Sequence, residues 1–329
     1  MSTLSLPSDF TLAHYRLTLE ALEPLHLPPF KGSALRGGFG HTFKQLVCSQ
    51  PWPCAQRCQR GNACPYGYIF ETAPPAGSEV LRTFREVPRP FVIEPPLDRR
   101  TYIPAGDRLT FGLTLVGRAI PFLPDFIVVF RELGRRGLGR RRGRYRLLAA
   151  DALLPPEGRT EPIYREEDGE VRSIGLPLGS PAIAAHAARL PSDRLTLHFL
   201  TPARLKHEGR WVRRGPPFHV LVKALLGRIS SLSYFHCGQR WETDFRGWID
   251  RARAVRLVAA ETRWEDWERF SGRQRRRVKM GGLVGRATYE GDLEPFLPLL
   301  TLGERVHVGK GTVFGNGQYR VNESTVRSP

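Results

Sequence analysis

The sequence predicts an α+β protein built from two similar halves. Alternating apolar and polar residues, typical of half-buried strands, flank stretches with helical spacing in each half. The stretches GLGRRRGRYRL (137–147) and GKGTVFGNGQYRV (309–321) each place a glycine-rich loop before a Tyr-Arg strand. Each half runs strand, helix, strands, helix, loop, strand, which is the order of a β-α-β-β-α-β, ferredoxin-like (RRM-like) unit. We therefore expect an internal duplication into two tandem ferredoxin-like domains.

In the first half, residues 14–22 (HYRLTLEAL) alternate apolar and polar side chains, which predicts a half-buried strand. A helix is expected over 33–47, because Ser33 can cap it and apolar residues recur there at helical spacing. The other elements expected in this half are a strand at 108–118, a helix at 124–134 that ends on glycine, and a strand at 145–149.

The second half follows a stretch rich in Pro, Gly, Glu and Asp at 156–192, which suits a linker or a hairpin insertion. Trp264, Trp267 and Phe270 have helical spacing and are expected to be core residues, with stacking platforms for bases as the less favoured alternative. The predicted elements are strands at 194–200, 253–260 and 305–308 and helices at 218–232 and 292–300. The predicted domains are 1–155, with a cysteine-rich insertion at 48–70, and 193–329, with a glycine-rich loop at 309–317.

Composition excludes two classes of protein. Apolar residues make up 41% of the 329 residues, enough for real cores, so global disorder is excluded. No run approaches the ~20 apolar residues that a membrane span needs. The start, MSTLSLPSDF, has neither the basic nor the apolar region of a signal peptide. We therefore expect a cytoplasmic protein with no membrane partner.

The net charge points to a polyanionic partner. Fifty Lys and Arg against 32 Asp and Glu give +18, and only six of the basic residues are Lys. Arginine presents a planar fork that matches phosphate and stacks on bases. A GC-rich genome would explain the excess of Arg over Lys but not the excess of positive over negative charge. Nucleic acid is therefore the expected partner.

The arginines are clustered. Residues 131–146 contain eight Arg among interspersed glycines, and residues 269–279 contain six basic residues. Such runs are often solvated faces, but glycine lets a backbone approach phosphate closely. We expect these phosphate contacts: Arg140, Arg141, Arg142, Arg273, Arg275, Arg276 and Arg277.

Four of the five cysteines lie within seventeen residues, as C-x5-C-x3-C-x5-C: Cys48, Cys54, Cys58 and Cys64. Four thiolates this close can hold a structural zinc ion. An iron–sulfur cluster, two disulfides and free thiols are the alternatives. Four protein thiolates leave no open coordination position, so a metal here would be structural. Cys237 is expected to be a lone thiol.

The segment ERFSGRQRRRVKMGGLVGRATYEGDLEPFLPLLTLGERVHVGKGTVFGNGQYRV resembles the C-terminal half of the CRISPR repeat-RNA processing endoribonucleases of the RAMP superfamily. LRGGFGHTFKQLVC and YGYIFET resemble the N-terminal half, and LTPARLKHEG and FHVLVKALLGRISSL the middle. The resemblance covers nearly the whole chain. It implies two tandem ferredoxin-like domains and specific binding of CRISPR repeat RNA. It also implies cleavage of precursor crRNA without a catalytic cofactor, in which the 2′-hydroxyl attacks and leaves 2′,3′-cyclic phosphate and 5′-hydroxyl ends.

This reaction needs a base at the 2′-hydroxyl, an acid at the leaving oxygen and positive charge at the phosphate. Histidine is the side chain best suited to proton transfer near pH 7. Of nine histidines, His41 is the first candidate, because the family usually keeps its catalytic histidine in the first helix. Lys44 lies one helical step away and is expected to act with it. His26, in the loop before that helix, is the second candidate.

The C-terminal loop has glycines around a lysine and is not a nucleotide P-loop, since the required upstream glycine and following helix are missing. His307 begins the loop and is expected to be structural, to position RNA or, less favoured, to be catalytic. The residues expected to contact RNA here are Lys310, His307, Gly309, Gly311, Gly315 and Gly317.

Two other functions remain open at the sequence level. One is a non-catalytic RNA-binding RAMP subunit that works with other CRISPR effector subunits. The other is a basic RNA-binding protein unrelated to CRISPR. The oligomeric state is not predicted.

Overall fold

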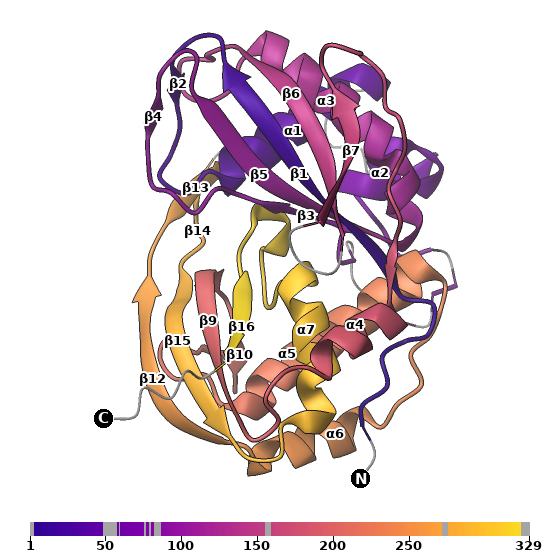
Figure 1. The fold of residues 1–329 in the computed structure, drawn as a ribbon, viewed down its shortest axis with the longest axis vertical. Helices are drawn as coiled ribbons and strands as arrows, with labels where there is room; N and C mark the ends of the chain where they lie inside the picture. The colour runs from indigo at the N-terminus through magenta and orange to yellow at the C-terminus, as the bar shows by residue number, and fades with distance from the viewer. Residues whose placement is uncertain are drawn as a thin grey trace. The chain divides into compact units, whose positions relative to one another are not determined.

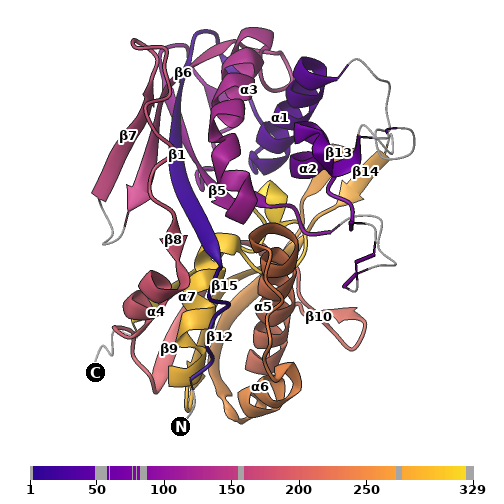
Figure 2. The same cartoon turned by 90° about the vertical axis from the view of Figure 1, so that its right-hand side faces the viewer.

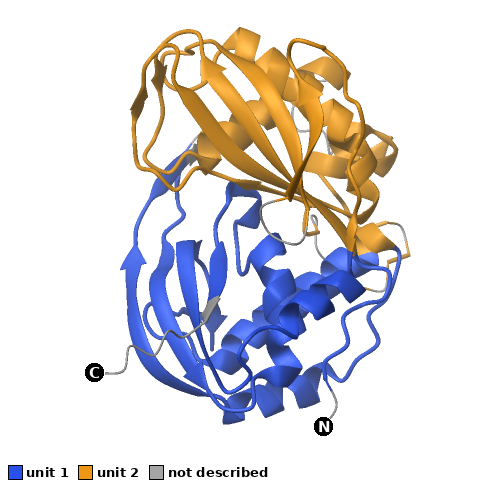
Figure 3. Ribbon diagram, in the orientation of Figure 1, with its two compact units in different colours: residues 1–10, 179–234, 238–329 blue, residues 11–178, 235–237 orange. Residues whose placement is uncertain are grey.

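The structure is a computed structural model that describes residues 3–48, 58, 60–75, 77–78, 80–81, 87–154, 159–271 and 276–323. Figures 1 and 2 show its elements in two views, and Figure 3 shows how the chain divides. Residues 11–178 and 235–237 form one compact unit, which we call unit 2. Residues 1–10, 179–234 and 238–329 form the other, unit 1. This division differs from the predicted boundaries.

Unit 2 is built on an antiparallel sheet. Its strand order is β3-β5-β1-β6-β7, and β8 also pairs with β1. Tyr15, Leu17 and Leu19 of β1 are buried, whereas Arg16 between them is exposed, as the alternation predicts. The bounds of the strands are β1 Thr11–Ala21, β3 Phe91–Glu94, β5 Arg108–Val116, β6 Tyr145–Leu154, β7 Arg159–Arg165 and β8 Leu178–Gly179.

Two helices, α1 (Gly32–Val47) and α3 (Leu123–Arg136), cover one face of this sheet. Phe39 of α1 is fully buried and stacks on Phe126 of α3, with ring centroids 4.5 Å apart. Aromatic burial of this kind removes large apolar areas from water and is the main source of stability in a small core. This packing fixes α1 against α3. It therefore also fixes the backbone from which the exposed side chains of the two helices extend.

Unit 1 repeats the arrangement. Its sheet order is β12-β15-β9-β16, and in both units the first strand lies between the third and the fourth. Helices α5 and α7 are the helices between these strands. The bounds are β9 Arg194–Ala203, α5 Phe218–Leu232, β12 Arg256–Glu265, β15 Gly282–Glu290, α7 Leu297–Val306 and β16 Tyr319–Glu323.

Short elements complete the two units. Two-stranded sheets are formed by β2 with β4, by β10 with β11 and by β13 with β14. The bounds of the strands and helices are β2 Leu25–His26, β4 Tyr102–Ile103, β10 Lys206–His207, β11 Arg210–Trp211, β13 Glu268–Ser271, β14 Arg276–Lys279, α2 Pro65–Phe70, α4 Ser180–Ala187 and α6 Phe245–Arg251. Among the described residues, no helix combines the length and the apolar run that a bilayer crossing requires.

Each unit includes a short segment that is distant in sequence from the rest of that unit. Residues 1–10 belong to unit 1, where the Leu4 amide donates to the Pro295 carbonyl (3.2 Å). A π-helical turn follows α5 and brings residues 235–237 into unit 2. There the fully buried His236 ring contacts the Tyr68 hydroxyl (3.2 Å) and the Pro88 carbonyl (2.7 Å). Burial raises the pKa of Tyr68 to about 12.

The α+β class with antiparallel sheets is confirmed, and the helix predicted at 218–232 has those bounds. Two local predictions are wrong. No strand forms at 305–308, because α7 continues to Val306 and His307 then turns the chain with φ of +61°. Trp264 and Trp267 are only half-buried, so they are not the core residues expected, and Trp264 and Phe270 lie on two consecutive strands, β12 and β13. The region 156–192, expected to be a linker or a hairpin insertion, contains β7, which pairs with β6 in antiparallel fashion, and also β8 and α4.

Candidate functional site

An open cleft of about 850 Å³ lies in unit 2, where α1, the end of α3 and the loop at 137–143 meet. His41 lines it together with Gln45, Arg136, Arg140 and Arg142. The cleft therefore combines the first catalytic candidate with two of the arginines that were expected to contact phosphate. It also adds Arg136 and Gln45, which the sequence analysis missed. Arg136 lies in the last turn of α3, and Gln45 lies one turn after His41 on α1. These positions are the signal that could have identified the two residues.

The loop at 137–143 is held against β2 by its backbone. Gly139 has φ of +81°, and a Cβ at this position would overlap the carbonyl oxygen of His26. The Arg140 amide donates to this same carbonyl (3.0 Å). Glycine is needed here because it alone allows both the left-handed conformation and the close approach. The contact fixes the backbone from which Arg140 and its neighbours extend.

The structure separates the predicted pair on α1. His41 is exposed, whereas the side chain of Lys44 is only 3% exposed. The buried residues of α1 include 42–44, so the helix buries a wider face than its apolar residues indicated, and Leu46 of the expected apolar face is 43% exposed. His41 therefore shares the open face with Gln45 and not with Lys44. The expected joint action of His41 and Lys44 does not match this geometry.

His26 is not in a loop but on the short strand β2. Its ring is half-buried and lies 5.3 Å from the Tyr102 ring, centroid to centroid. Its carbonyl, as described above, holds the loop that lines the cleft. His26 is thus close to the cleft through its backbone, although it does not belong to the lining residues.

Acidic residues divide the arginines around the cleft into two groups. Arg136 pairs with Glu132 (2.7 Å), and Arg144 pairs with Glu23 (2.7 Å). The hydrogen bonds from these arginines lower the pKa of both carboxyl groups, so both pairs stay ionised near neutral pH. Within the described part of the chain, no ion pair includes the exposed Arg140, Arg141 or Arg142. The tip of the loop therefore carries uncompensated positive charge.

The glycine-rich loop of unit 1 has one exposed functional side chain, Lys310. His307 is fully buried and its Nδ1 lies 3.2 Å from the Asn316 carbonyl, which fits the structural role among those expected for it. Gly315 and Gly317 are also buried, and Gly317 allows the close approach of the Val308 carbonyl. These residues shape the loop, whereas Gly309 and Gly311 flank Lys310 at its partly exposed end.

The two basic loops are anchored in the same way. In unit 1 the Lys310 amide donates to the Arg204 carbonyl (3.3 Å), and a Cβ on Gly309 would come within 2.6 Å of that oxygen. In unit 2 the Arg140 amide likewise donates to the His26 carbonyl, and a Cβ on Gly139 would overlap that carbonyl oxygen. In both cases a glycine with φ near +80° precedes a cation, and the accepting residue follows the first strand of the unit.

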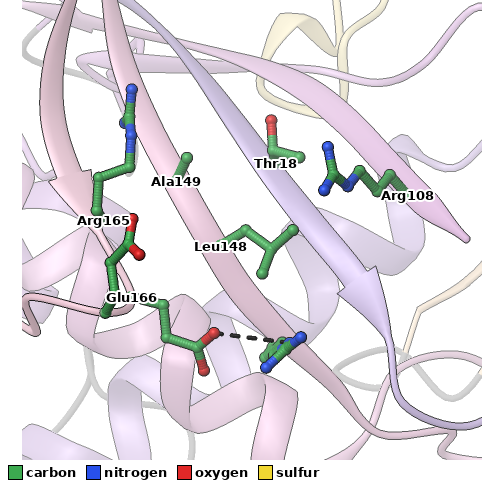
Figure 4. A pocket seen from close by; sticks show the side chains of 8 residues that line it. Thr18, Arg108, Leu148, Ala149, Arg165 and Glu166 are labelled. Atoms are coloured by element: carbon green, nitrogen blue, oxygen red, sulfur yellow. Dashed lines mark ion pairs between the residues drawn. The ribbon is translucent and has the colours of Figure 1, made fainter. Parts of the chain in front are cut away.

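A second hollow, of about 760 Å³, lies on the face of the unit 2 sheet that α1 and α3 leave uncovered (Figure 4). Arg108, Arg146 and Arg165 line it, but two of them are compensated. Arg146 lies 3.6 Å from Glu166, and Arg165 lies 2.6 Å from Asp151. No candidate residue from the sequence analysis lines this hollow. The first cleft is therefore the better candidate for a reaction centre.

Several predicted site residues are not placed at either cleft. Cys54, Arg273 and Arg275 lie outside the described residues. Cys48, at the end of α1, Cys58 and Cys64, which precedes α2, are partly exposed. Among the residues that the structure describes, no group of three or more His, Cys, Asp or Glu could hold a metal ion. The exposed Arg276 and Arg277 lie on β14.

The chain matches two protein families. Residues 197–319 match the family described as CRISPR-associated endoribonuclease Cas6. Residues 10–175 match the family AF_1859_N, described as an N-terminal domain. An uncharacterized protein from Archaeoglobus fulgidus is 26% identical over 325 residues, which cover 95% of this chain and 99% of that protein.

Solved structures share the fold at low sequence identity. A chain of the partial Cas6-RT-Cas1–Cas2 complex has a TM-score of 0.62 and 14% identity; the match covers 98% of this chain and 48%, about half, of that one. A Cas6 product complex has a TM-score of 0.55 and 16% identity over 95% and 99% of the two chains. Thermus thermophilus Cas6 has a TM-score of 0.53 and 14% identity, with the same coverage.

The anchoring of the 137–143 loop can be tested with Gly139→Ala. The matched control is Gly106→Ala, because Gly106 has φ of +87° but open space where a Cβ would lie. Both variants pay the left-handed strain, and only Gly139→Ala must also displace the His26 carbonyl. We expect it to lose about 1–3 kcal/mol more free energy of unfolding than the control, measured by urea titration, together with faster hydrogen exchange at the Arg140 amide. Equal losses in the two variants would contradict the anchoring.

Proposed function

We propose that this chain, whose residues 197–319 match the family of CRISPR-associated Cas6 endoribonucleases, binds CRISPR repeat RNA and cuts precursor crRNA. The observation that carries this proposal is an exposed histidine, His41, in a cleft whose loop bears uncompensated arginines. The net charge of +18 supports a polyanionic substrate. We also infer that the two units are tandem ferredoxin-like domains, which their common strand order supports.

The reaction we propose is an internal transesterification. The 2′-oxygen upstream of the scissile phosphate bonds to phosphorus, and the bond from phosphorus to the 5′-oxygen breaks. One proton leaves the 2′-hydroxyl and one is taken up by the 5′-oxygen, so the products are a 2′,3′-cyclic phosphate and a 5′-hydroxyl. This chemistry requires no divalent ion and no cofactor, because the ribose supplies the nucleophile.

His41 would serve as one proton-transfer group, since it is exposed at the cleft and histidine is the side chain best suited to proton transfer. Arg140 and Arg142 would stabilise the negative charge that grows on the phosphate oxygens. Arg136 is held by Glu132 and by Gln45, so it would orient the substrate from a fixed position. His26 is the remaining histidine candidate for the second proton transfer.

The alternative is a non-catalytic RNA-binding subunit of a CRISPR effector complex. It would share the fold, the charge and both basic loops with the enzyme. The exposed His41 at the cleft favours the enzyme, because a subunit that only binds RNA does not need a proton-transfer group there. Other CRISPR proteins remain proposed partners in either case.

Replacing His41 tests the catalytic assignment. His41→Ala should lower the rate of repeat RNA cleavage by about 10²–10⁴-fold, since a proton-transfer group contributes on that order. RNA affinity should stay near the wild-type value, because the arginines are unchanged. The matched control is His186→Ala, which removes a partly exposed histidine from α4 and should leave the rate unchanged. A variant that binds RNA weakly and cleaves at the normal rate once saturated would reassign His41 to binding.

The substrate tests the chemistry. End-labelled repeat RNA should be cut once in EDTA, and a single 2′-deoxy substitution before the cleaved bond should abolish the cut without weakening binding. Mass spectrometry of the upstream product should show a cyclic phosphate. Loss of cleavage in EDTA, with thermal melting of the protein unchanged, would contradict the metal-independent mechanism. Tight binding without any cut would favour the non-catalytic subunit.

We also propose that the cysteine-rich insertion holds a structural metal ion. The support is the close spacing of four cysteines in one connection, between the end of α1 and the start of α2. Elemental analysis of the purified protein should find about one zinc ion per chain, and Cys58→Ser/Cys64→Ser should lose it while Cys237→Ser retains it. Iron in place of zinc would identify an iron–sulfur cluster. Protein without metal would reject the site.

A further inference from the structure

The segment that follows β9 is strongly basic. Residues 204–214 contain five Arg and Lys and one acidic residue, Glu208. Its strands β10 and β11 form a two-stranded hairpin, in which Lys206 pairs with Trp211 and His207 with Arg210. The hairpin projects from the body of unit 1 (Figure 2). The five basic residues are Arg204, Lys206, Arg210, Arg213 and Arg214, and all except the half-buried Arg204 are exposed.

These cations lack acidic partners, in contrast to other arginines of unit 1. Over the described ranges, no ion pair includes any of the five. Arg194 and Arg256, by comparison, both pair with Glu290, at 3.8 and 2.6 Å. Exposed like charges repel one another, and this repulsion is relieved when a polyanion binds. The hairpin therefore has the electrostatic property expected of a contact with phosphates.

Aromatic rings hold three of the cations in place. The Arg204 guanidinium lies 4.6 Å from the centre of the Trp211 ring, and Lys206 Nζ lies 4.9 Å from it. Arg213 lies 5.0 Å from the centre of the Trp264 ring on β12. Such cation–π contacts restrict long side chains before any ligand arrives. Restricted side chains lose less entropy on binding, so the same charge gives a tighter contact.

Arg204 connects the hairpin to the glycine-rich loop. Its Nη1 donates to the Lys279 carbonyl on β14 (2.6 Å), and its own carbonyl accepts the Lys310 amide (3.3 Å). A polyanion that touches the exposed Lys310 would therefore reach the hairpin through an adjacent part of the same unit. Both hydrogen bonds lie within unit 1, so this link between the hairpin and the glycine-rich loop does not depend on the other unit.

We propose that the β10–β11 hairpin is a second RNA-contact element, which binds the sugar-phosphate backbone of the substrate RNA beside the glycine-rich loop. This inference rests on the proposed function. Phosphates are the suitable ligand class, because the cations are several, exposed and uncompensated, and because Trp211 already holds two of them. The hairpin belongs to unit 1 and does not line the cleft that contains His41, so the role we propose for it is affinity and not chemistry.

The test compares two double variants that remove the same charge. Lys206→Ala/Arg210→Ala removes two uncompensated cations of the hairpin, and Arg194→Ala/Arg256→Ala removes two paired arginines of the same unit. Binding of repeat RNA is measured by fluorescence anisotropy at several salt concentrations. Two lost phosphate contacts should weaken binding about tenfold near 0.15 M salt and reduce the log–log salt slope by about 1.4. The control should change both quantities much less, and the cleavage rate at saturating RNA should stay unchanged in both variants.

Other results would overturn the inference. Equal losses in the two double variants would show that only the total charge matters. Unchanged RNA binding in Lys206→Ala/Arg210→Ala would show that the hairpin does not contact the RNA. An acidic protein would then be the partner that its charge fits. If that variant melts at a lower temperature, Trp211→Leu replaces it, since this change keeps the charge and should still weaken RNA binding. Wild-type protein that does not bind repeat RNA would instead refute the proposed function, which separates the two failures.

Discussion

A close approach between a glycine and a carbonyl oxygen sets the position of each basic loop. Gly139 lies against the His26 carbonyl and Gly309 against that of Arg204, and in each case the next residue's amide donates to the same oxygen. A side chain at either glycine would push the loop away. The cleft at His41 and the surface around Lys310 both depend on this contact, because the loop backbone determines where the cations point.

Charge compensation then decides which cations are available. The chain has far more arginines than a reaction centre needs, and many pair with carboxylates, as Arg146 of β6 does with Glu20 on the neighbouring β1. Such surface pairs add little stability, but they remove those arginines from competition for phosphate. The cations at the loop tip and on the β10–β11 hairpin have no such pairs within the described residues. Positive charge is thereby concentrated at a few places, although the total is spread over the chain.

Sequence periodicity predicted the α+β class, α1 and α5 well, because each buries one face and its apolar spacing records that face. It failed where the same spacing of aromatic residues can arise either from a helix or from strands. The Trp264 to Phe270 spacing resembles a helix but arises from two consecutive strands, β12 and β13. His41 could be found from its helix and the resemblance, whereas the burial of Lys44 depends on how α1 packs, which spacing alone does not record. The partners Arg136 and Gln45 come from separate helices, so only the tertiary structure joins them.

The way the chain returns between the units limits how they can be separated. Unit 2 includes residues 235–237, and unit 1 includes residues 1–10. A protease cut between 178 and 179 would leave the first fragment without His236, the partner of the Tyr68 hydroxyl and the Pro88 carbonyl. The second fragment would lack the segment that bonds to Pro295. Neither unit can therefore be transferred to another protein as one continuous segment. Such a transfer would require joining the unit's distant segments anew, as in a circular permutation.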